Sequence, residues 1–158
     1  MNKQKIFEFE FNNIESEVNF YVNTTNLDAY NAIFYNKNNN IFLIGPAKSG
    51  KSFLGKIWLN KNKAIKYDKN FDYIIANNKN ILVDDINSNI NQENLFHIIN
   101  HCKLLNLKIL IVSNYNINEL NFSLKDLDSR LKIFSQYKIN KPDDDMLLNI
   151  LTKLFIEN

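Results

Sequence analysis

The chain has 158 residues, of which 45% are hydrophobic and 23% charged, and its formal net charge is +2. This length and composition are typical of one globular domain and exclude an intrinsically disordered protein. So small a net charge does not by itself indicate a nucleic-acid or membrane-surface partner. The single cysteine, Cys102, excludes an internal disulfide, and no apolar run has the length of a signal peptide or a membrane span. We therefore expect a soluble, cytoplasmic protein without a membrane partner.

Short apolar segments alternate with amphipathic ones along the chain. The segment KIFEFEF (5–11) alternates with a period of two, which predicts a strand or an extended arm. The segments IFLI, ILVDD and KILIVSN are typical of strands that are buried on both faces of a parallel sheet. Strands are expected at 41–44, 64–67, 81–85, 108–114 and 133–139. Helices are expected at 27–34, 51–60, 92–106, 124–131 and 142–155.

This alternation predicts an α/β fold, with a parallel sheet of about five strands flanked by helices. The last helix is expected to have Pro142 near its first turn and three aspartates at the positive end of its dipole. Its leucines Leu147, Leu151 and Leu154 recur on one stripe.

All three glycines of the chain, Gly45, Gly50 and Gly55, lie within GPAKSGKSFLG. Residues 45–52 fit the pattern G-x-x-x-x-G-K-[ST], directly after a predicted buried strand and before a helix, which is the context of a phosphate-binding loop. Glycines allow the backbone N–H groups to turn inward onto phosphate oxygens, a lysine binds the β- and γ-phosphates, and a serine hydroxyl binds Mg²⁺. We expect Gly55 to let the following helix approach the sheet closely. The predicted nucleotide-binding residues of this loop are Gly45, Pro46, Ala47, Lys48, Ser49, Gly50, Lys51, Ser52 and Phe53.

Polar residues end two of the other predicted strands. Asp84 and Asp85 close ILVDD, and Ser113 and Asn114 close KILIVSN. Ligands collect at this edge of a parallel sheet, so we expect Asp84 to hold Mg²⁺ together with Ser52, and Asp85 to orient an attacking water. Asn114, with Ser113 as the alternative, is expected to bond the γ-phosphate or that water. Acids also cap strands without any catalytic role in α/β folds.

Arg130 is the only arginine in a chain whose other basic residues are lysines, and it lies in KDLDSRLKIF. A planar guanidinium can make two parallel hydrogen bonds to a phosphate, which lysine cannot. One interpretation is therefore an arginine finger that reaches nucleotide bound by a neighbouring subunit. The other is a surface ion pair with Asp126 or Asp128.

Five segments resemble, in order, the AAA+ core of the DnaA family of replication initiators, and more closely its short Hda-type regulators. They are NFYVNTTNLDAYNAI, GPAKSGKS, ILVDDI, LKDLDSRL and KINKPDDDMLLNILTKLF. The resemblance implies a P-loop AAA+ core over residues 13–141, with Tyr21, Val22 and Asn26 near the adenine and Arg130 as the finger. It also implies that residues 142–158 form the first helix of a truncated lid.

Hda-type proteins carry a glutamine-led hexapeptide that docks into the sliding clamp of the DNA polymerase. The segment QKIFEF (4–9) is similar, with Gln4, Phe7 and Phe9 at the matching positions, so residues 1–12 would be a clamp-binding arm. It departs from the pattern at Lys5, where an aliphatic residue is usual. Alternatively, Phe7 and Phe9 form the buried face of an edge strand.

The resemblance implies a regulator of replication initiation that the clamp recruits and that promotes hydrolysis of ATP bound to DnaA. Its own ligands would be ADP or ATP with Mg²⁺, and its own ATPase activity would be weak. No helix-turn-helix pattern accompanies the core, so sequence-specific DNA binding is not expected, and association with further copies stays open. The alternatives are a helicase-loading or transposition-helper ATPase and a catalytically idle clamp-binding adaptor.

Overall fold

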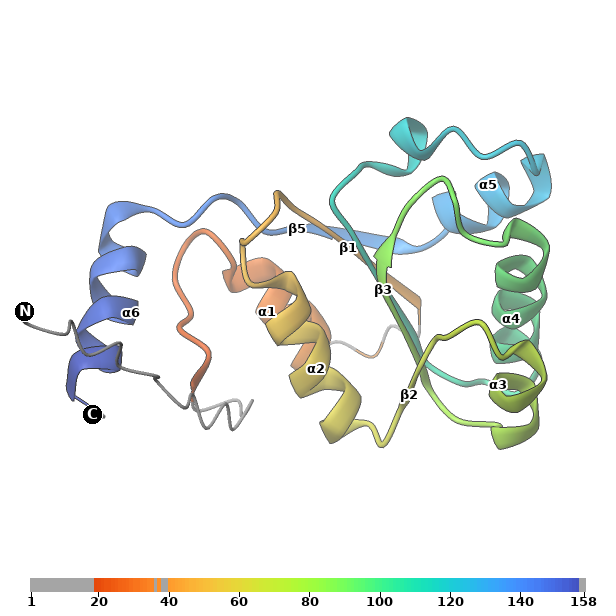
Figure 1. Ribbon diagram of the computed structural model, residues 1–158, viewed down its shortest axis with the longest axis horizontal. Helices are drawn as coiled ribbons and strands as arrows, with labels where there is room; N and C mark the ends of the chain where they lie inside the picture. The colour runs from red at the N-terminus through yellow and green to blue at the C-terminus, as the bar shows by residue number, and fades with distance from the viewer. Residues whose placement is uncertain (1–18, 36, 38–39, 157–158) are drawn as a thin grey trace, which may run out of the picture.

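The computed structural model of the chain describes residues 19–35, 37 and 40–156 (Figure 1). In these residues, short strands alternate with helices, as the sequence predicts. The strands are β1 (Asn40–Ile44), β2 (Ile65–Lys66), β3 (Ile81–Ile86), β4 (Ile109–Ser113) and β5 (Ser135–Lys138). The helices are α1 (Leu27–Tyr35), α2 (Lys51–Lys61), α3 (Phe71–Asn77), α4 (Gln92–Leu104), the 3-10 helix η2 (Ile117–Leu120), α5 (Lys125–Lys132) and α6 (Asp144–Ile156).

The strands form one parallel sheet in the order β2-β3-β4-β1-β5, which confirms the predicted α/β class. β1 comes first in the chain but lies between β4 and β5, so that Leu43 is opposite Val112 on one side and Tyr137 on the other. The carboxyl ends of parallel strands lie along one edge of a sheet. That edge therefore brings together the residues that follow β1, β3 and β4.

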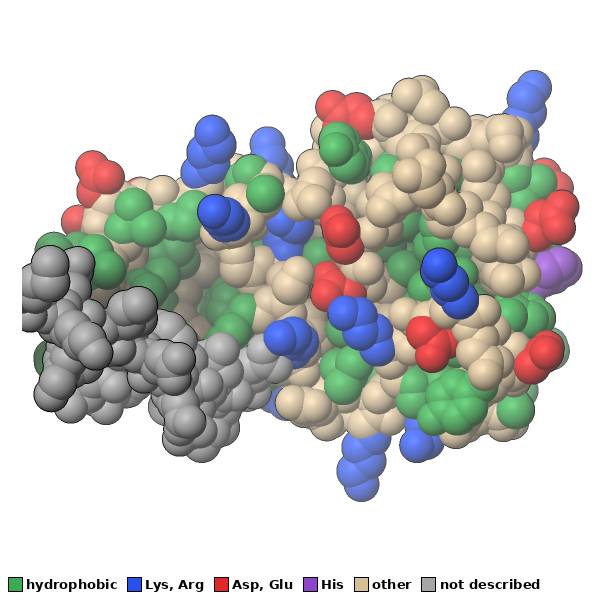
Figure 2. All heavy atoms as spheres, viewed as in Figure 1, with side chains coloured by type: hydrophobic (Ala, Val, Ile, Leu, Met, Phe, Trp, Pro, Cys, Tyr) green, Lys and Arg blue, Asp and Glu red, His purple; other side chains and the backbone are tan. Residues whose placement is uncertain are grey.

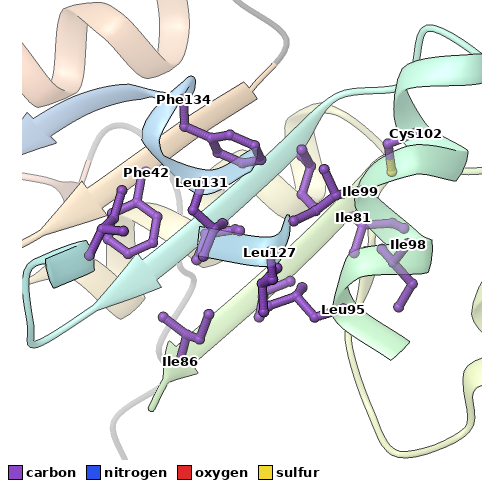
Figure 3. Close-up of a cluster of buried hydrophobic side chains, with 14 of the residues drawn as sticks. Phe42, Ile81, Ile86, Leu95, Ile98, Ile99, Cys102, Leu127, Leu131 and Phe134 are labelled. Atoms are coloured by element: carbon purple, nitrogen blue, oxygen red, sulfur yellow. The ribbon is translucent and has the colours of Figure 1, made fainter. Parts of the chain in front are cut away.

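Helices cover both faces of the sheet: α1 and α2 lie on one face, and α3, α4 and α5 on the other (Figure 1). Side chains alternate between the two faces, because successive residues of a strand point in opposite directions. In β1, Phe42 packs in the cluster under α4 and α5, whereas Ile41 and Leu43 pack in the cluster under α1 and α2. Figure 3 shows the first cluster, in which burial raises the pKa of the Cys102 thiol to about 12.

Two short helices were not expected from the sequence. The segment FDYIIAN of α3 has apolar residues at helical spacing, Phe71, Ile74 and Ile75, but is only seven residues long, and the Asn70 side chain caps it by accepting the backbone N–H of Tyr73 at 3.1 Å. The 3-10 helix η2 begins with a capping box between its N-cap Asn116 and Glu119. Both caps use asparagine, which is so abundant in this chain that it does not stand out as a helix signal.

The helical spacing of the sequence predicts that Leu27 lies on the apolar face of the helix at 27–34 and Leu105 on that of the helix at 92–106. Both of these placements are wrong. α1 buries Ala29, Ala32 and Ile33, whereas Leu27 is 44% exposed, because it is the first residue of the helix. α4 ends at Leu104, so Leu105 is its C-cap and is exposed.

α6 lies beyond α1, at the end of the molecule opposite α4 (Figure 1). It begins at Asp144, two residues after Pro142, because Asp143 is the cap: its carboxylate accepts the backbone N–H of Met146 at 2.8 Å. Met146 is buried, whereas the predicted stripe residues Leu147 and Leu151 are 47% and 51% exposed. No described helix is both long and apolar enough to span a membrane.

Candidate nucleotide-binding site

The glycine-rich loop joins β1 to α2 at the carboxyl edge of the sheet. Gly50 is the N-cap of α2 and has φ 90°, a left-handed conformation that favours glycine, and Lys48 also has a positive φ of 62°. No side chain caps this helix. Its first backbone N–H groups are therefore left for a ligand, at the end of the helix where the dipole favours an anion.

The two other glycines lie in close contacts with the rest of the fold. A Cβ atom on Gly45 would lie 2.6 Å from the backbone oxygen of Ile139, which follows β5, and the Gly45 N–H donates to Ser113 O at 3.2 Å. The start of the loop is thus held between the ends of β4 and β5. A Cβ on Gly55 would lie 3.3 Å from Leu82 Cδ1, which confirms that this residue lets α2 approach the sheet.

Lys51 is folded back onto its own loop. Its ammonium group donates to the Pro46 carbonyl and, at 3.3 Å, to Ser49 Oγ, and the residue is only 5% exposed. Burial lowers the pKa of Lys51 below its usual 10.5, although the carboxylates of Asp85 and Asp84 act in the opposite direction. A buried cation without a bound anion is an unfavourable arrangement that a phosphate group would relieve.

The predicted metal ligands Ser52 and Asp84 lie together. Ser52 Oγ donates to Asp84 Oδ1 at 3.1 Å, although the two residues are 32 positions apart in the sequence. A hydroxyl and a carboxylate are hard oxygen ligands of the kind that Mg²⁺ prefers, and Mg²⁺ takes its remaining ligands from water and nucleotide phosphates. Among the described residues, no group of three or more His, Cys, Asp or Glu side chains could hold a metal ion by itself. The donor set therefore fits Mg²⁺ delivered with a nucleotide.

A third residue at this point was missed by the sequence analysis. Lys66 Nζ lies 3.2 Å from the second carboxylate oxygen of Asp84. Lys66 ends the short edge strand β2, and its place beside β3 depends on the pairing of Lys66 with Leu82. Only the strand order could have revealed this contact.

Asp85 lies at an irregularity in β3. The register between β3 and β4 shifts between Val83 and Ile86, and Asp85 has φ 60°. Asn114 Nδ2 donates to Asp85 Oδ1 at 3.1 Å, so the predicted water-orienting pair is brought together at the surface. Ser113 is fully buried, accepts from the Tyr115 N–H and donates to the Ile86 carbonyl. Between the two candidates, the geometry therefore favours Asn114.

A cavity of about 500 Å³ lies over the phosphate loop. Its lining consists of Ala47, Lys48, Ser49, Gly50, Lys51, Ser52, Phe53, Asp84, Asp85, Val112, Ser113 and Asn114. Of the predicted loop residues, all except Gly45 and Pro46 line it, together with both acids and Asn114.

The segment before α1 lies next to the loop. Phe20 stacks on Phe53 with ring centroids 5.9 Å apart, and a Cβ atom on Gly50 would lie 3.5 Å from Phe20 Cε2. Tyr21 and Val22 do not line the cavity, and Asn26 is 1% exposed with both ends of its amide bonded within the turn, to the Asn23 N–H and the Tyr21 carbonyl. Asn26 shapes this turn, and contact of these residues with adenine stays a prediction. Phe20 was missed, because its place depends on the path of the chain.

Arg130 lies on α5, on the sheet face opposite α2, and does not line the cavity. Its neighbours Leu127 and Leu131 are fully buried in the core (Figure 3), and Arg130 itself is partly exposed. The Asp128 carboxylate pairs with Lys132 at 2.6 Å. Among the described residues, no hydrogen bond or ion pair engages the side chain of Arg130. The alternative of a surface ion pair for Arg130 is therefore not found. The predicted clamp-binding residues Gln4, Phe7 and Phe9 lie outside the described residues.

Solved structures of replication initiators have a similar fold. A DNA replication initiation factor superposes with a TM-score of 0.81 and 22% identity over 91% of this chain. Domain III of DnaA from Thermotoga maritima gives a TM-score of 0.77 and 23% identity over 92% of the chain. DnaA from Aquifex aeolicus, solved with AMPPCP bound, gives 0.73 and 22% over 89%.

The chain spans 55% of the first structure, 75% of the Thermotoga domain and 54% of the Aquifex protein. No protein-family model and no curated protein sequence matches it. Likeness at this level of identity establishes a shared fold. The chain therefore shares the α/β fold of domain III of DnaA.

Proposed function

We propose that the chain is a nucleotide-binding AAA+ domain that regulates the initiation of DNA replication. The observation that carries the proposal is the meeting of the phosphate loop with Asp84, through the 3.1 Å hydrogen bond from Ser52. A loop of this shape, a buried lysine and a carboxylate at the end of another strand of the sheet, here β3, are the parts that bind a nucleoside triphosphate and its metal. ADP or ATP is the ligand that this set of residues fits.

Each part has a role in binding the phosphates. The free N–H groups behind Gly50 would bind phosphate oxygens, and Lys51 would exchange its contact with the Pro46 carbonyl for the β- and γ-phosphates. When bound, Mg²⁺ would neutralise phosphate charge, held by Ser52 and by Asp84. Asp85 and Asn114 would orient water at the γ-phosphate.

The position of Arg130 supports action in trans. The side chain lies away from the phosphate loop of its own chain and has no partner among the described residues. In an Hda-type mechanism, Arg130 would reach ATP held by a DnaA molecule and stabilise the charge that develops during hydrolysis. Gln4, Phe7 and Phe9 would bring the chain to the sliding clamp, and the chain's own ATPase activity would be weak.

Nucleotide binding is tested by calorimetry with ADP and ATP in the presence of Mg²⁺. We expect Lys51→Ala to weaken binding about 10- to 100-fold, the range that a hydrogen bond from a charged group commonly contributes. The matched control is Lys79→Ala, which removes an exposed lysine before β3, at the opposite edge of the sheet. Equal affinities of the wild type and Lys51→Ala would contradict the proposal and would favour an idle adaptor.

The regulatory role is tested by measuring ATP hydrolysis by DnaA with the chain and the DNA-loaded clamp. Arg130→Ala is expected to abolish the stimulation, and Arg130→Lys is not expected to restore it, because lysine lacks the planar pair of donors. Gln4→Ala should remove stimulation and clamp binding while nucleotide binding persists. Stimulation that survives Arg130→Ala would exclude the finger, and turnover driven by single-stranded DNA without the clamp would favour a helicase loader.

A further inference from the structure

The metal-binding end of the site already contains a cation, Lys66, that belongs to neither the phosphate loop nor β3. Lys66, the last residue of the edge strand β2, places its Nζ 3.2 Å from Asp84 Oδ2. On the face shown in Figure 2, basic side chains are scattered, but acidic and basic side chains lie next to each other near its centre. Lys66 and Asp84 form one such acid–base contact at 3.2 Å, and Lys66 has no assigned role in phosphate binding by the loop.

Asp84 is fully engaged in this arrangement. One carboxylate oxygen accepts the Ser52 hydroxyl at 3.1 Å, and the other is paired with Lys66. The Asp84 side chain is only 10% exposed, whereas that of Lys66 is 55% exposed. The lysine can therefore leave toward solvent, while the carboxylate stays in place beside Ser52.

We propose that Lys66 competes with the divalent metal for Asp84. The inference rests on the proposed nucleotide-binding function, to which it adds a residue that tunes the metal affinity. In the metal-free chain the ammonium group neutralises the carboxylate and keeps it beside the phosphate loop. A divalent ion that uses Asp84, directly or through water, must displace Lys66 or bind next to its positive charge, and either event lowers the affinity for the metal.

The size of the effect follows from the exposure of Lys66. A pair with one exposed partner contributes little free energy, so its loss is expected to change metal affinity only about two- to fivefold. The sign of the change in binding affinity distinguishes the role of Lys66 from that of Lys51. Loss of Lys66 should strengthen metal binding and leave metal-free nucleotide binding unchanged, whereas loss of Lys51 should weaken nucleotide binding with and without the metal.

The first experiment titrates Mn²⁺ alone into the nucleotide-free chain and follows free Mn²⁺ by electron paramagnetic resonance. Lys66→Met is expected to lower the Mn²⁺ dissociation constant about two- to fivefold. Lys66→Arg keeps the charge and should behave like the wild type. The matched control is Lys69→Met, which removes an exposed lysine of the same segment whose side chain makes no hydrogen bond or ion pair with the described residues.

The second experiment measures ADP affinity in EDTA and in Mg²⁺. Lys66→Met should bind ADP as the wild type does in EDTA and should reach half-saturation at about two- to fivefold lower Mg²⁺. The proposal is overturned if Lys66→Met binds Mn²⁺ no more tightly than the wild type, if Lys69→Met has the same effect, or if Lys66→Met weakens ADP binding in EDTA. A wild type that binds no nucleotide would refute the proposed function, and the Mn²⁺ titration would still decide the role of Lys66.

Discussion

The glycines of the phosphate loop are there for different physical reasons, so their substitutions should differ. A Cβ on Gly45 meets a backbone oxygen at 2.6 Å, which cannot move aside without shifting the chain after β5. A Cβ on Gly55 meets the tip of the Leu82 side chain at 3.3 Å, and that side chain can yield.

We therefore predict that Gly45→Ala lowers the free energy of unfolding by about 1–3 kcal/mol, the usual range for an overpacked site. Gly55→Ala should change it by less than about 1 kcal/mol, because the preference of helices for alanine offsets the tighter packing. Urea denaturation of both variants measures the difference. Equal losses would mean that the contact with the Ile139 carbonyl is not what requires glycine at position 45.

We expect Lys51 to support nucleotide binding while lowering the thermal stability of the nucleotide-free chain. The residue is 5% exposed, and burial lowers its pKa. We predict that Lys51→Met raises the melting temperature of the nucleotide-free chain at neutral pH by about 2–4 °C, equivalent to ~1 kcal/mol, because the cost of burying a charged ammonium group is removed.

The pH dependence of this gain has a definite sign. The pKa of Lys51 is lower in the folded state than its usual value of 10.5 in the unfolded chain. As the pH rises toward 10.5, the folded chain loses the Lys51 proton first, so the unfolded chain holds more protons than the folded chain. Wild-type stability contributed by Lys51 therefore rises with pH in that range, and the advantage of Lys51→Met should shrink. Thermal scans at neutral and alkaline pH measure it, and an advantage that grows with pH would contradict the assignment.

At the scale of elements, α6 is held mainly through polar contacts with the segment before α1. Asp143 caps α6, and its two carboxylate oxygens also accept hydrogen bonds from Asn23 Nδ2 at 3.0 and 3.1 Å. Asn149 donates to the Tyr21 hydroxyl at 2.9 Å, while much of the apolar surface of α6 is exposed. Such an element opens more easily than the core.

We predict that Asp143→Ala lowers the free energy of unfolding by about 1–2 kcal/mol, since it removes a helix cap and a second contact. Amide hydrogen exchange should accelerate in α6 and not in β1 or β4. Asp144→Ala, in the exposed first turn, is the matched control and should change little. Acceleration that extends through the sheet would show that α6 and the core open as one unit.

The sequence predicts the strands, the phosphate loop and its acids because each depends on local pattern. β1 and β4 are continuous apolar runs, and the loop is a contiguous motif. Contacts made by strand order cannot be found in this way. Lys66 reaches Asp84 only because β2 pairs with β3, and Phe20 reaches Gly50 only because the chain before α1 turns back toward the loop.

At the scale of the whole molecule, the site is assembled at one edge of the sheet from residues between Phe20 and Asn114. The chain as a whole has no strong net charge, so the proposed affinity for phosphate would depend on this local arrangement and not on a general field. Helix α6, whose leucines Leu147, Leu148 and Leu151 are exposed, lies at the end of the molecule opposite α4 (Figure 1).

The position of β1 between β4 and β5 also determines when, during synthesis, the proposed nucleotide site can form. The phosphate loop is made early, but its first glycine bonds to Ser113 and packs against Ile139, and both are made much later. Pairings between residues so distant in sequence form slowly, and domains fold as units as the chain emerges. We therefore expect that a growing chain that already contains the whole phosphate-loop motif cannot complete the proposed nucleotide site until its fifth strand has left the ribosome.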